Sequence, residues 1–206
     1  MKKIAILALL ALVATGAFAQ ARVSLGGGLL MDYSANNGVL GSNFFSGERI
    51  FSIGGFVFFD ATYIEVDLGI SYGSVTFYHK EVNSLHTEDG GSYEQLNLAL
   101  LVKYPFEMGK ITLFPLFGIH YNRILSAKLP DDTKWVDAEE LCSQFGILAG
   151  LGLDYHFTDA FFLRSEVLLH LRFPMKFYKD EADEWYDLTA TVGAGPQIKI
   201  AVGYRF

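Results

Sequence analysis

Charged side chains occupy alternate positions inside segments that are otherwise apolar. Glu65 and Asp67 lie in one such segment, and Arg164 and Glu166 lie in another. Because alternate residues of a β-strand point to the same side, each segment places its charges on one face. Charges that face one another away from water must pair. The sequence therefore predicts a network of paired charges. Its members are Glu65, Asp67, Lys103, Asp154, Arg164, Glu166 and Lys199.

Nucleophilic catalysis would need a serine, a histidine and an orienting acid at one site. Candidate residues share the charged faces, but no serine and histidine stand at one end of a common face. The candidates are Ser52, Ser71, His120, His156 and His170. We therefore predict no catalytic residues and no enzymatic activity, and a lipid-modifying enzyme is the least favoured function.

Metal and cofactor motifs are also missing from the pattern. No histidine, cysteine or carboxylate run has metal-ligand spacing, and the glycines at 26–28 lie inside a strand-like segment instead of opening a helix. We predict no metal and no cofactor. The single cysteine, Cys142, has no partner for an internal disulfide, and the net charge of -7 argues against a nucleic-acid partner.

The elements that must position these side chains are segments of strict period-two alternation, which predict β-strands. Each is long enough to cross a bilayer at a tilt. The eight segments span residues 22–33, 51–59, 64–73, 95–104, 111–122, 144–157, 161–173 and 197–206.

The N-terminal residues 1–19 have the features of a cleaved export signal. Lys2 and Lys3 precede an apolar run over residues 4–14, and an Ala-Phe-Ala site ends at Ala19. The apolar run is short for a transmembrane helix, although a retained anchor helix is the alternative reading. We expect cleavage after Ala19, which leaves residues 20–206.

The connections between segments alternate in length. Short turns are expected at 59–62, 105–110 and 158–160, and long polar loops at 35–48, 79–92, 127–141 and 176–189. Short turns on one side and long loops on the other are typical of outer-membrane barrels. A soluble eight-stranded barrel, with its apolar faces turned inward, is the alternative.

Aromatic residues gather at the two ends of the apolar faces, as they do at membrane interfaces. The turn-side band comprises Phe59, Tyr104, Phe106, Tyr155, Phe157, Phe161, Tyr204 and Phe206. The loop-side band comprises Tyr33, Phe51, Tyr72, Tyr121, Phe145 and Phe173. The opposite faces would then line the interior.

The interior of an eight-stranded barrel is just wide enough to be filled by side chains. The large apolar residues expected there are Phe56, Phe58, Phe114, Leu116, Leu148, Phe162 and Leu168. Further charges expected there are Arg22, Asp32, Arg172 and Arg205. Counted from the short turns, the seven network residues fall in the turn-side half. We expect the network to plug that half of the lumen, with Asp154 and Arg164 as a cross-strand pair.

The last segment ends on an aromatic after alternating apolar residues, and it must pair with the first segment to close a barrel. This ending, the N-terminal signal and the eight-segment layout resemble the small bacterial outer-membrane β-barrels of the OmpA/OmpX-like type, barrel domain only. The resemblance implies an all-β, eight-stranded antiparallel up-and-down transmembrane barrel over residues 20–206. It also implies that the barrel-assembly machinery reads the terminal strand, through Ile200, Val202, Tyr204 and Phe206.

The resemblance places the protein in the bacterial outer membrane, in contact with outer-membrane lipid. The favoured function is a structural or surface-interaction role, adhesin-like, through the long acidic loops. The candidate loop residues for an extracellular partner are Asp131, Asp132, Trp135, Asp183, Glu184 and Trp185. A narrow porin-like channel for small solutes is the alternative.

Overall fold

The computed structural model describes residues 22–40, 44–81, 84–128, 130–131, 133, 144–174 and 193–206. These residues lie almost entirely in β-strands. The strands are β1 (Val23–Leu40), β2 (Phe44–Ala61), β3 (Ile64–Glu81), β4 (Ser84–Lys103), β5 (Phe106–Met108), β6 (Ile111–Lys128), β7 (Gln144–His156), β8 (Phe161–Pro174) and β9 (Gly193–Arg205). In this part of the chain, no helix is long and apolar enough to cross a membrane.

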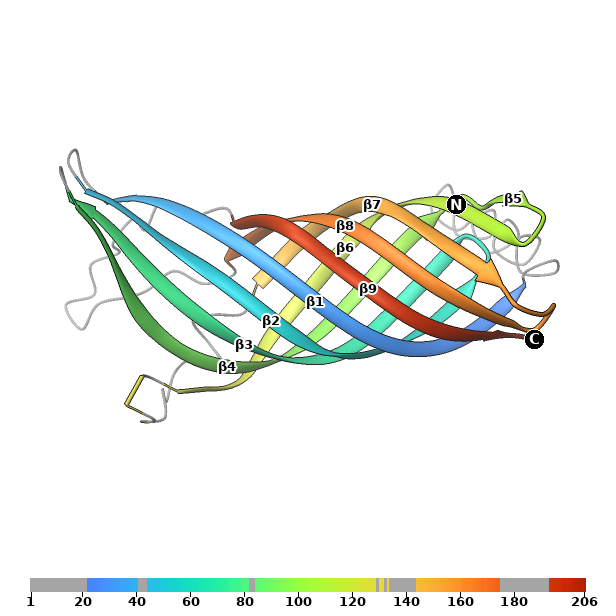
Figure 1. Ribbon diagram of the computed structural model, residues 1–206, viewed down its shortest axis with the longest axis horizontal. Coiled ribbons are helices and arrows are strands. Elements are labelled where there is room, and N and C mark those ends of the chain that lie inside the picture. The colour runs from blue at the N-terminus through green and yellow to red at the C-terminus, as the bar shows by residue number, and fades with distance from the viewer. Residues whose placement is uncertain are drawn as a thin grey trace, which may run out of the picture.

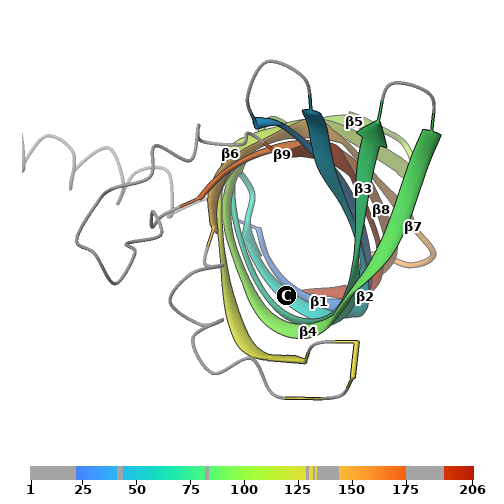
Figure 2. The same ribbon diagram turned by 90° about the vertical axis from the view of Figure 1, so that its left-hand side faces the viewer.

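Eight of the strands form a closed antiparallel barrel, as predicted (Figures 1 and 2). Consecutive strands pair around the ring, and β4 pairs directly with β6. The three-residue β5 only folds back on the start of β6, so it adds a short hairpin at the turn side. The ring leaves no free sheet edge among these eight strands, which is how a barrel satisfies its backbone.

The ring closes where β9 meets β1. Ser24 lies opposite Arg205, and Leu25 lies opposite Tyr204. Beyond the ladder, the Phe206 amide donates to the Val23 carbonyl at 2.9 Å. The expected pairing of the last segment with the first is therefore confirmed.

The strands turn their apolar faces outward. Leu29, Leu151 and Leu169 are 64%, 68% and 66% exposed, whereas the charged residues between such positions are buried. A soluble barrel of the lipocalin kind would bury these leucines inside. That alternative is therefore wrong for this chain.

The aromatic bands follow the register of the strands. On the loop side, Tyr33 lies opposite Phe51, and Phe145 lies between Tyr121 and Phe173 on its two neighbouring strands. Neighbouring strands thus bring these rings to a similar height on the outer wall.

On the turn side, ring centroids of Phe161 and Tyr204 are 5.1 Å apart, and those of Tyr204 and Phe206 are 5.0 Å apart. A second group there joins Tyr63, Tyr104 and Phe106, with centroid separations of 6.1 and 5.1 Å along the series. The outer wall therefore carries aromatic rings in contact at this end.

Two of the predicted loops are wrong. Residues 35–48 and 79–92 are largely strand, because β1 runs to Leu40, β2 starts at Phe44, β3 runs to Glu81 and β4 starts at Ser84. Backbone hydrogen bonds hold a ladder whatever its side chains are, so polar residues extend these strands. Figure 1 shows β1–β4 reaching beyond β7–β9 at this end. Of the other two loops, 176–189 lies outside the described residues and 127–141 largely does.

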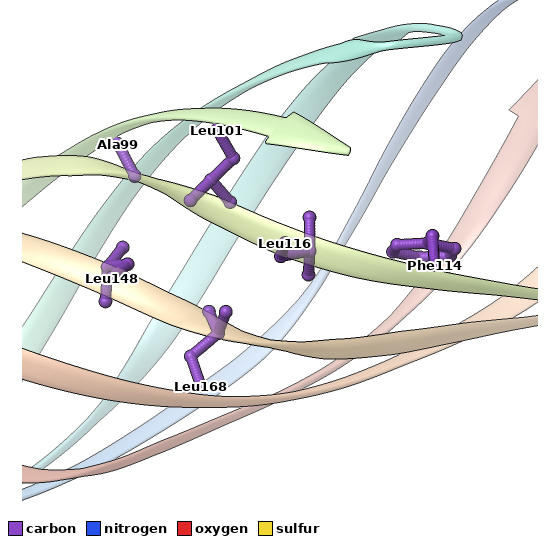
Figure 3. Close-up of a cluster of buried hydrophobic side chains, with 6 residues drawn as sticks. All are labelled: Ala99, Leu101, Phe114, Leu116, Leu148 and Leu168. Atoms are coloured by element: carbon purple, nitrogen blue, oxygen red, sulfur yellow. The ribbon is translucent and has the colours of Figure 1, made fainter. Parts of the chain in front are cut away.

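Apolar side chains fill much of the lumen, and all seven residues expected there are buried. One cluster, shown in Figure 3, comprises Ala99, Leu101, Phe114, Leu116, Leu148 and Leu168, from β4, β6, β7 and β8. A second comprises Leu30, Phe56, Phe58, Phe162 and Ala201, from β1, β2, β8 and β9. The two clusters share only β8, which contributes Leu168 to the first and Phe162 to the second.

Glycines on the inner face make room for the phenylalanine rings. A Cβ built at Gly152 would lie 2.1 Å from the Phe114 ring, and one at Gly203 would lie 2.2 Å from the Phe162 ring. Real carbon atoms do not approach so closely. The narrow lumen therefore has room for these large rings because the neighbouring strand has no side chain at the paired position.

Gly152→Ala should destabilise the barrel by about 1–3 kcal/mol, because the new methyl overlaps Phe114 in a packed interior. Gly55→Ala is the matched control: it faces outward, and the nearest atom to its Cβ is 3.7 Å away. Urea unfolding in lipid vesicles, followed by the gel-mobility difference between folded and unfolded protein, measures both. Equal unfolding midpoints for the two variants would contradict the packing argument.

Candidate functional site in the barrel lumen

Arg164 is the centre of a buried network in the turn-side half of the lumen. It points inward from β8, and its Nε and Nη2 donate to the two oxygens of Asp154 at 2.7 and 2.8 Å. Its Nη1 donates to Glu65 at 2.6 Å, and Nη2 also donates to Asp60 at 2.7 Å. One guanidinium thus joins carboxylates from β2, β3 and β7. This fork geometry is what arginine offers and lysine does not.

Two lysines extend the network. Lys103 donates to Asp60, and to Glu65 at 3.2 Å. Lys199 donates to Asp67, and to Glu166 at 3.2 Å. All the residues expected in the network are buried and brought together here. Some of these bonds join neighbouring strands, but those of Arg164 to Asp60 and Glu65, and of Lys199 to Asp67, run between strands that are not neighbours in the ring, so they cross the lumen.

Asp60 belongs to the network although the sequence analysis placed it in a short turn. It lies in β2, opposite Glu65 of β3 and Ser24 of β1, and it is buried. Continuing the alternation of Phe56 and Phe58 by one step would have found it. The strand runs up to Ala61, so the turn is shorter than its polar residues indicate.

Aromatic rings surround the central guanidinium. Arg164 Cζ lies 4.3 Å from the centroid of Phe58, 5.1 Å from that of Phe114 and 5.2 Å from that of Phe162. Ring faces attract cations, most strongly where water is excluded. The rings thus fix the position of the arginine that links the carboxylates.

A second and smaller network surrounds Asp32 of β1. Arg172 Nη2 donates to Asp32 at 2.6 Å, and Gln197 Nε2 donates to the same oxygen at 3.0 Å. His170 Nδ1 lies 3.4 Å from it. We expected Asp32 and Arg172 to face inward but did not predict this group, because its members are far apart in sequence.

Arg22 does not belong to the lumen, and its predicted inward position is wrong. It precedes β1, and its half-exposed side chain forms an ion pair with Glu107 of β5. At the rim the wall has ended, so a long side chain can reach across the turn-side opening.

A small cavity lies between the two networks. Its lining includes Asp67 and Lys199 from the first network, Gln197 from the second, and His120 and Asn122 from β6. The volume open to the centre of a water molecule is about 20 Å³, which is enough room for one water molecule.

Ser71, His120 and His156 have polar partners of their own, whereas the buried Oγ of Ser52 has no hydrogen-bond partner among the described residues. Ser71 accepts hydrogen bonds from Asn97 at 2.9 Å and from Gln95 at 3.1 Å. His120 Nδ1 lies 3.4 Å from the Asn122 side-chain oxygen, and the His120 and His170 ring centroids are 6.0 Å apart. His156 lies 3.2 Å from Thr112 at the turn side.

The remaining predicted residues lie on the outer wall or at the loops. The predicted assembly signal faces outward at the end of β9, where its four residues are exposed: Ile200, Val202, Tyr204 and Phe206. Its recognition by the assembly machinery stays a prediction. Asp131 is exposed, and the Thr133 amide donates to it at 3.0 Å, which lowers the pKa of its carboxyl. The other loop candidates lie outside the described residues. They are Asp132, Trp135, Asp183, Glu184 and Trp185.

The profile of one protein family matches nearly the whole chain. This family is described as "Outer membrane protein beta-barrel domain", and its profile matches residues 5–206. The chain belongs to this family of outer-membrane β-barrel proteins. No curated protein matches the chain.

Solved structures show the same fold at low sequence identity. OprG from Pseudomonas aeruginosa is 13% identical, with a TM-score of 0.55 over 90% of this chain and 96% of that one. Outer membrane protein W from E. coli is 16% identical, with a TM-score of 0.50 over 90% and 98%. At these identities the likeness concerns the fold alone.

Arg164→Met should destabilise the barrel by about 3–5 kcal/mol, because it leaves Asp60, Glu65 and Asp154 short of their shared cation. Arg22→Met should cost less than about 1 kcal/mol, because its ion pair is exposed to solvent. Urea unfolding of both variants in the same vesicles checks the difference. An Arg164 variant as stable as the Arg22 variant would show that the network contributes little.

Proposed function

We propose that this protein is an integral protein of the bacterial outer membrane with a structural or surface-interaction role. Eight strands would cross the bilayer, and the segments between β1 and β2, β3 and β4, β6 and β7, and β8 and β9 would face outward from the cell. The N-terminal segment, residues 1–19, would direct export and be removed. The terminal strand would be recognised by the barrel-assembly machinery.

The outer wall supports the membrane location. Large apolar side chains cover it, and burial of such a surface in lipid is favourable because water is excluded from it. Aromatic groups at the two ends are what an interface between lipid and water favours. Membership of the family points the same way.

The observation that carries the proposed role is the set of buried ion pairs across the lumen. Arg164, Lys103 and Lys199 bind carboxylates from other strands, with phenylalanine rings packed around them. A lumen closed in this way favours a function at the loop side over solute passage. Residues of 127–141 and 176–189 are acidic and include both tryptophans, Trp135 and Trp185. We propose these segments as the contact region for an extracellular partner.

Epitope tags test location and orientation together. A tag inserted between β8 and β9, within 176–189, should bind antibody on intact cells. A tag at Asp159, in the turn between β7 and β8, should bind only after the outer membrane is permeabilised. Equal labelling of the two tags on intact cells would reject the proposed orientation, and labelling of both tags only after permeabilisation would reject exposure of the loops at the cell surface.

A narrow channel is the second candidate, and the polar cavity between the two networks favours it. Small ions that pass Arg172 and Asp32 would meet this cavity before the Arg164 network. Ion pairs of the Arg164 network span the lumen on the other side of this cavity in the described part of the chain, so we rank the channel second. We also propose that the protein is not an enzyme. This proposal rests on Ser71 and His120, whose polar side-chain atoms lie against amide side chains instead of against each other.

Planar-bilayer recordings of the full chain separate the two candidates. The structural role predicts no steady conductance, because the ion pairs and rings fill the turn-side half of the lumen. Protease protection of the same preparation in liposomes verifies insertion. Reproducible single-channel steps from inserted protein would favour the channel and contradict a closed lumen.

A further inference from the structure

Acids outnumber bases in the Arg164 network. Among the described residues it holds five carboxylates and three bases. The carboxylates are Asp60, Glu65, Asp67, Asp154 and Glu166, and the bases are Lys103, Arg164 and Lys199. Fully ionised, the network carries two excess negative charges inside the barrel. Burial of unbalanced charge is costly, so a positive species must balance it.

The excess lies in one place. Glu65 and Asp67 point inward from β3, and Glu166 points inward from β8, across the lumen. Each offers a carboxylate oxygen, and these three oxygens lie within 4.8 Å of one another. The three residues are 0%, 4% and 0% exposed. We call them the carboxylate trio.

The bases of the network leave part of the trio unsatisfied. Arg164 and Lys103 bind Oε2 of Glu65, and Lys199 binds Oδ2 of Asp67 and Oε2 of Glu166. The second oxygen of each carboxylate is buried and has no hydrogen-bond partner in the described structure. Nε of Arg164 lies 3.9 Å from Glu166 Oε1, which is too long for a hydrogen bond.

Buried carboxylate oxygens without donors are ligands for hard cations. Calcium binds carboxylate oxygens at about 2.3–2.6 Å, so three oxygens around one ion lie within about 5 Å of one another. Carboxylate and water ligands suit Mg²⁺, Ca²⁺ and Mn²⁺ in preference to softer metals. The cavity beside Asp67 has room for a water ligand. Spacing along the chain gave no sign of this site, because Glu166 is far from Glu65 in sequence.

We propose that Glu65, Asp67 and Glu166 bind one divalent cation of the hard, oxygen-preferring class. The ion neutralises the two excess charges and ties β3 to β8 across the lumen. Lys199 and Arg164 stay on the opposite oxygens of the same carboxylates. This inference goes beyond the proposed function, because it requires the lumen network but no particular role for the loops.

Metal content after refolding tests the proposal. The full chain is refolded in micelles with Mn²⁺ and passed through EDTA and a desalting column, and the retained manganese is counted by atomic absorption. We expect about one equivalent per folded wild-type barrel, as a single carboxylate site would hold. Glu166→Gln keeps the side-chain size and an acceptor for Lys199 but removes a charged ligand. It should retain at least about fivefold less metal.

Asp32→Asn is the matched control, because it removes a buried carboxylate from the other network and should retain metal like the wild type. Gel mobility without heating verifies that each variant is folded. Infrared spectra of metal-free wild type and Glu166→Gln provide the second measurement. About a tenth of an equivalent of manganese is the adventitious level. If wild type retains less than that and shows a carboxylic-acid carbonyl band that disappears in Glu166→Gln, protons and not a metal ion balance the charge. Equal retention by wild type and Glu166→Gln would place the metal elsewhere, and either result overturns the proposal.

Discussion

Hydrogen bonds between β9 and β1 leave the eight-stranded ring without a free edge, and this closure decides where every side chain lies. In a closed ring, each strand has one face toward the outside and one toward the lumen. A shift of one residue at the seam would turn the apolar face of β9 inward. The pairing of Leu25 with Tyr204 keeps both outside, and that of Gly26 with Gly203 leaves space inside for the rings of Phe58 and Phe162.

The narrow lumen then sets the chemistry of the interior. Eight strands enclose a space that side chains must fill, so rings and ions share it. Arg164 lies between the rings of Phe58, Phe114 and Phe162 and holds carboxylates from three strands. Rings and ions support each other, because the rings exclude the water that would weaken the ion pairs. A wider barrel of the same sequence pattern would leave these charges in water.

The family and the fold define the class of protein more closely than its activity. Barrels of this architecture share a wall of alternating residues, while their functions depend on loops and lumen side chains that differ from one protein to the next. For this chain, the described residues place the Arg164 and Asp32 networks in the lumen, the exposed ion pair of Arg22 and Glu107 at the turn-side rim, and the acidic Asp131 at the loop side. The proposal of a closed lumen rests on the arrangement of the lumen side chains. The proposal of a surface contact rests on the composition of the loops.

Period-two alternation by itself determined the strands, their two faces and most of the buried ions, because in a β-strand the face of a residue follows from its position alone. It therefore placed Glu65, Asp67 and Arg164 inside, and Tyr204 and Phe206 outside. Polarity was a poor guide to strand ends, since backbone ladders continue through polar residues, and so the lengths of β1–β4 and the place of Asp60 were missed. The pair of Asp154 and Arg164 on neighbouring strands was predicted from the sequence, but the other ion pairs of the lumen were decided by the tertiary structure. Contacts such as Glu65 with Arg164, or Asp32 with Arg172, depend on the curvature and register of the whole ring, which no local pattern encodes.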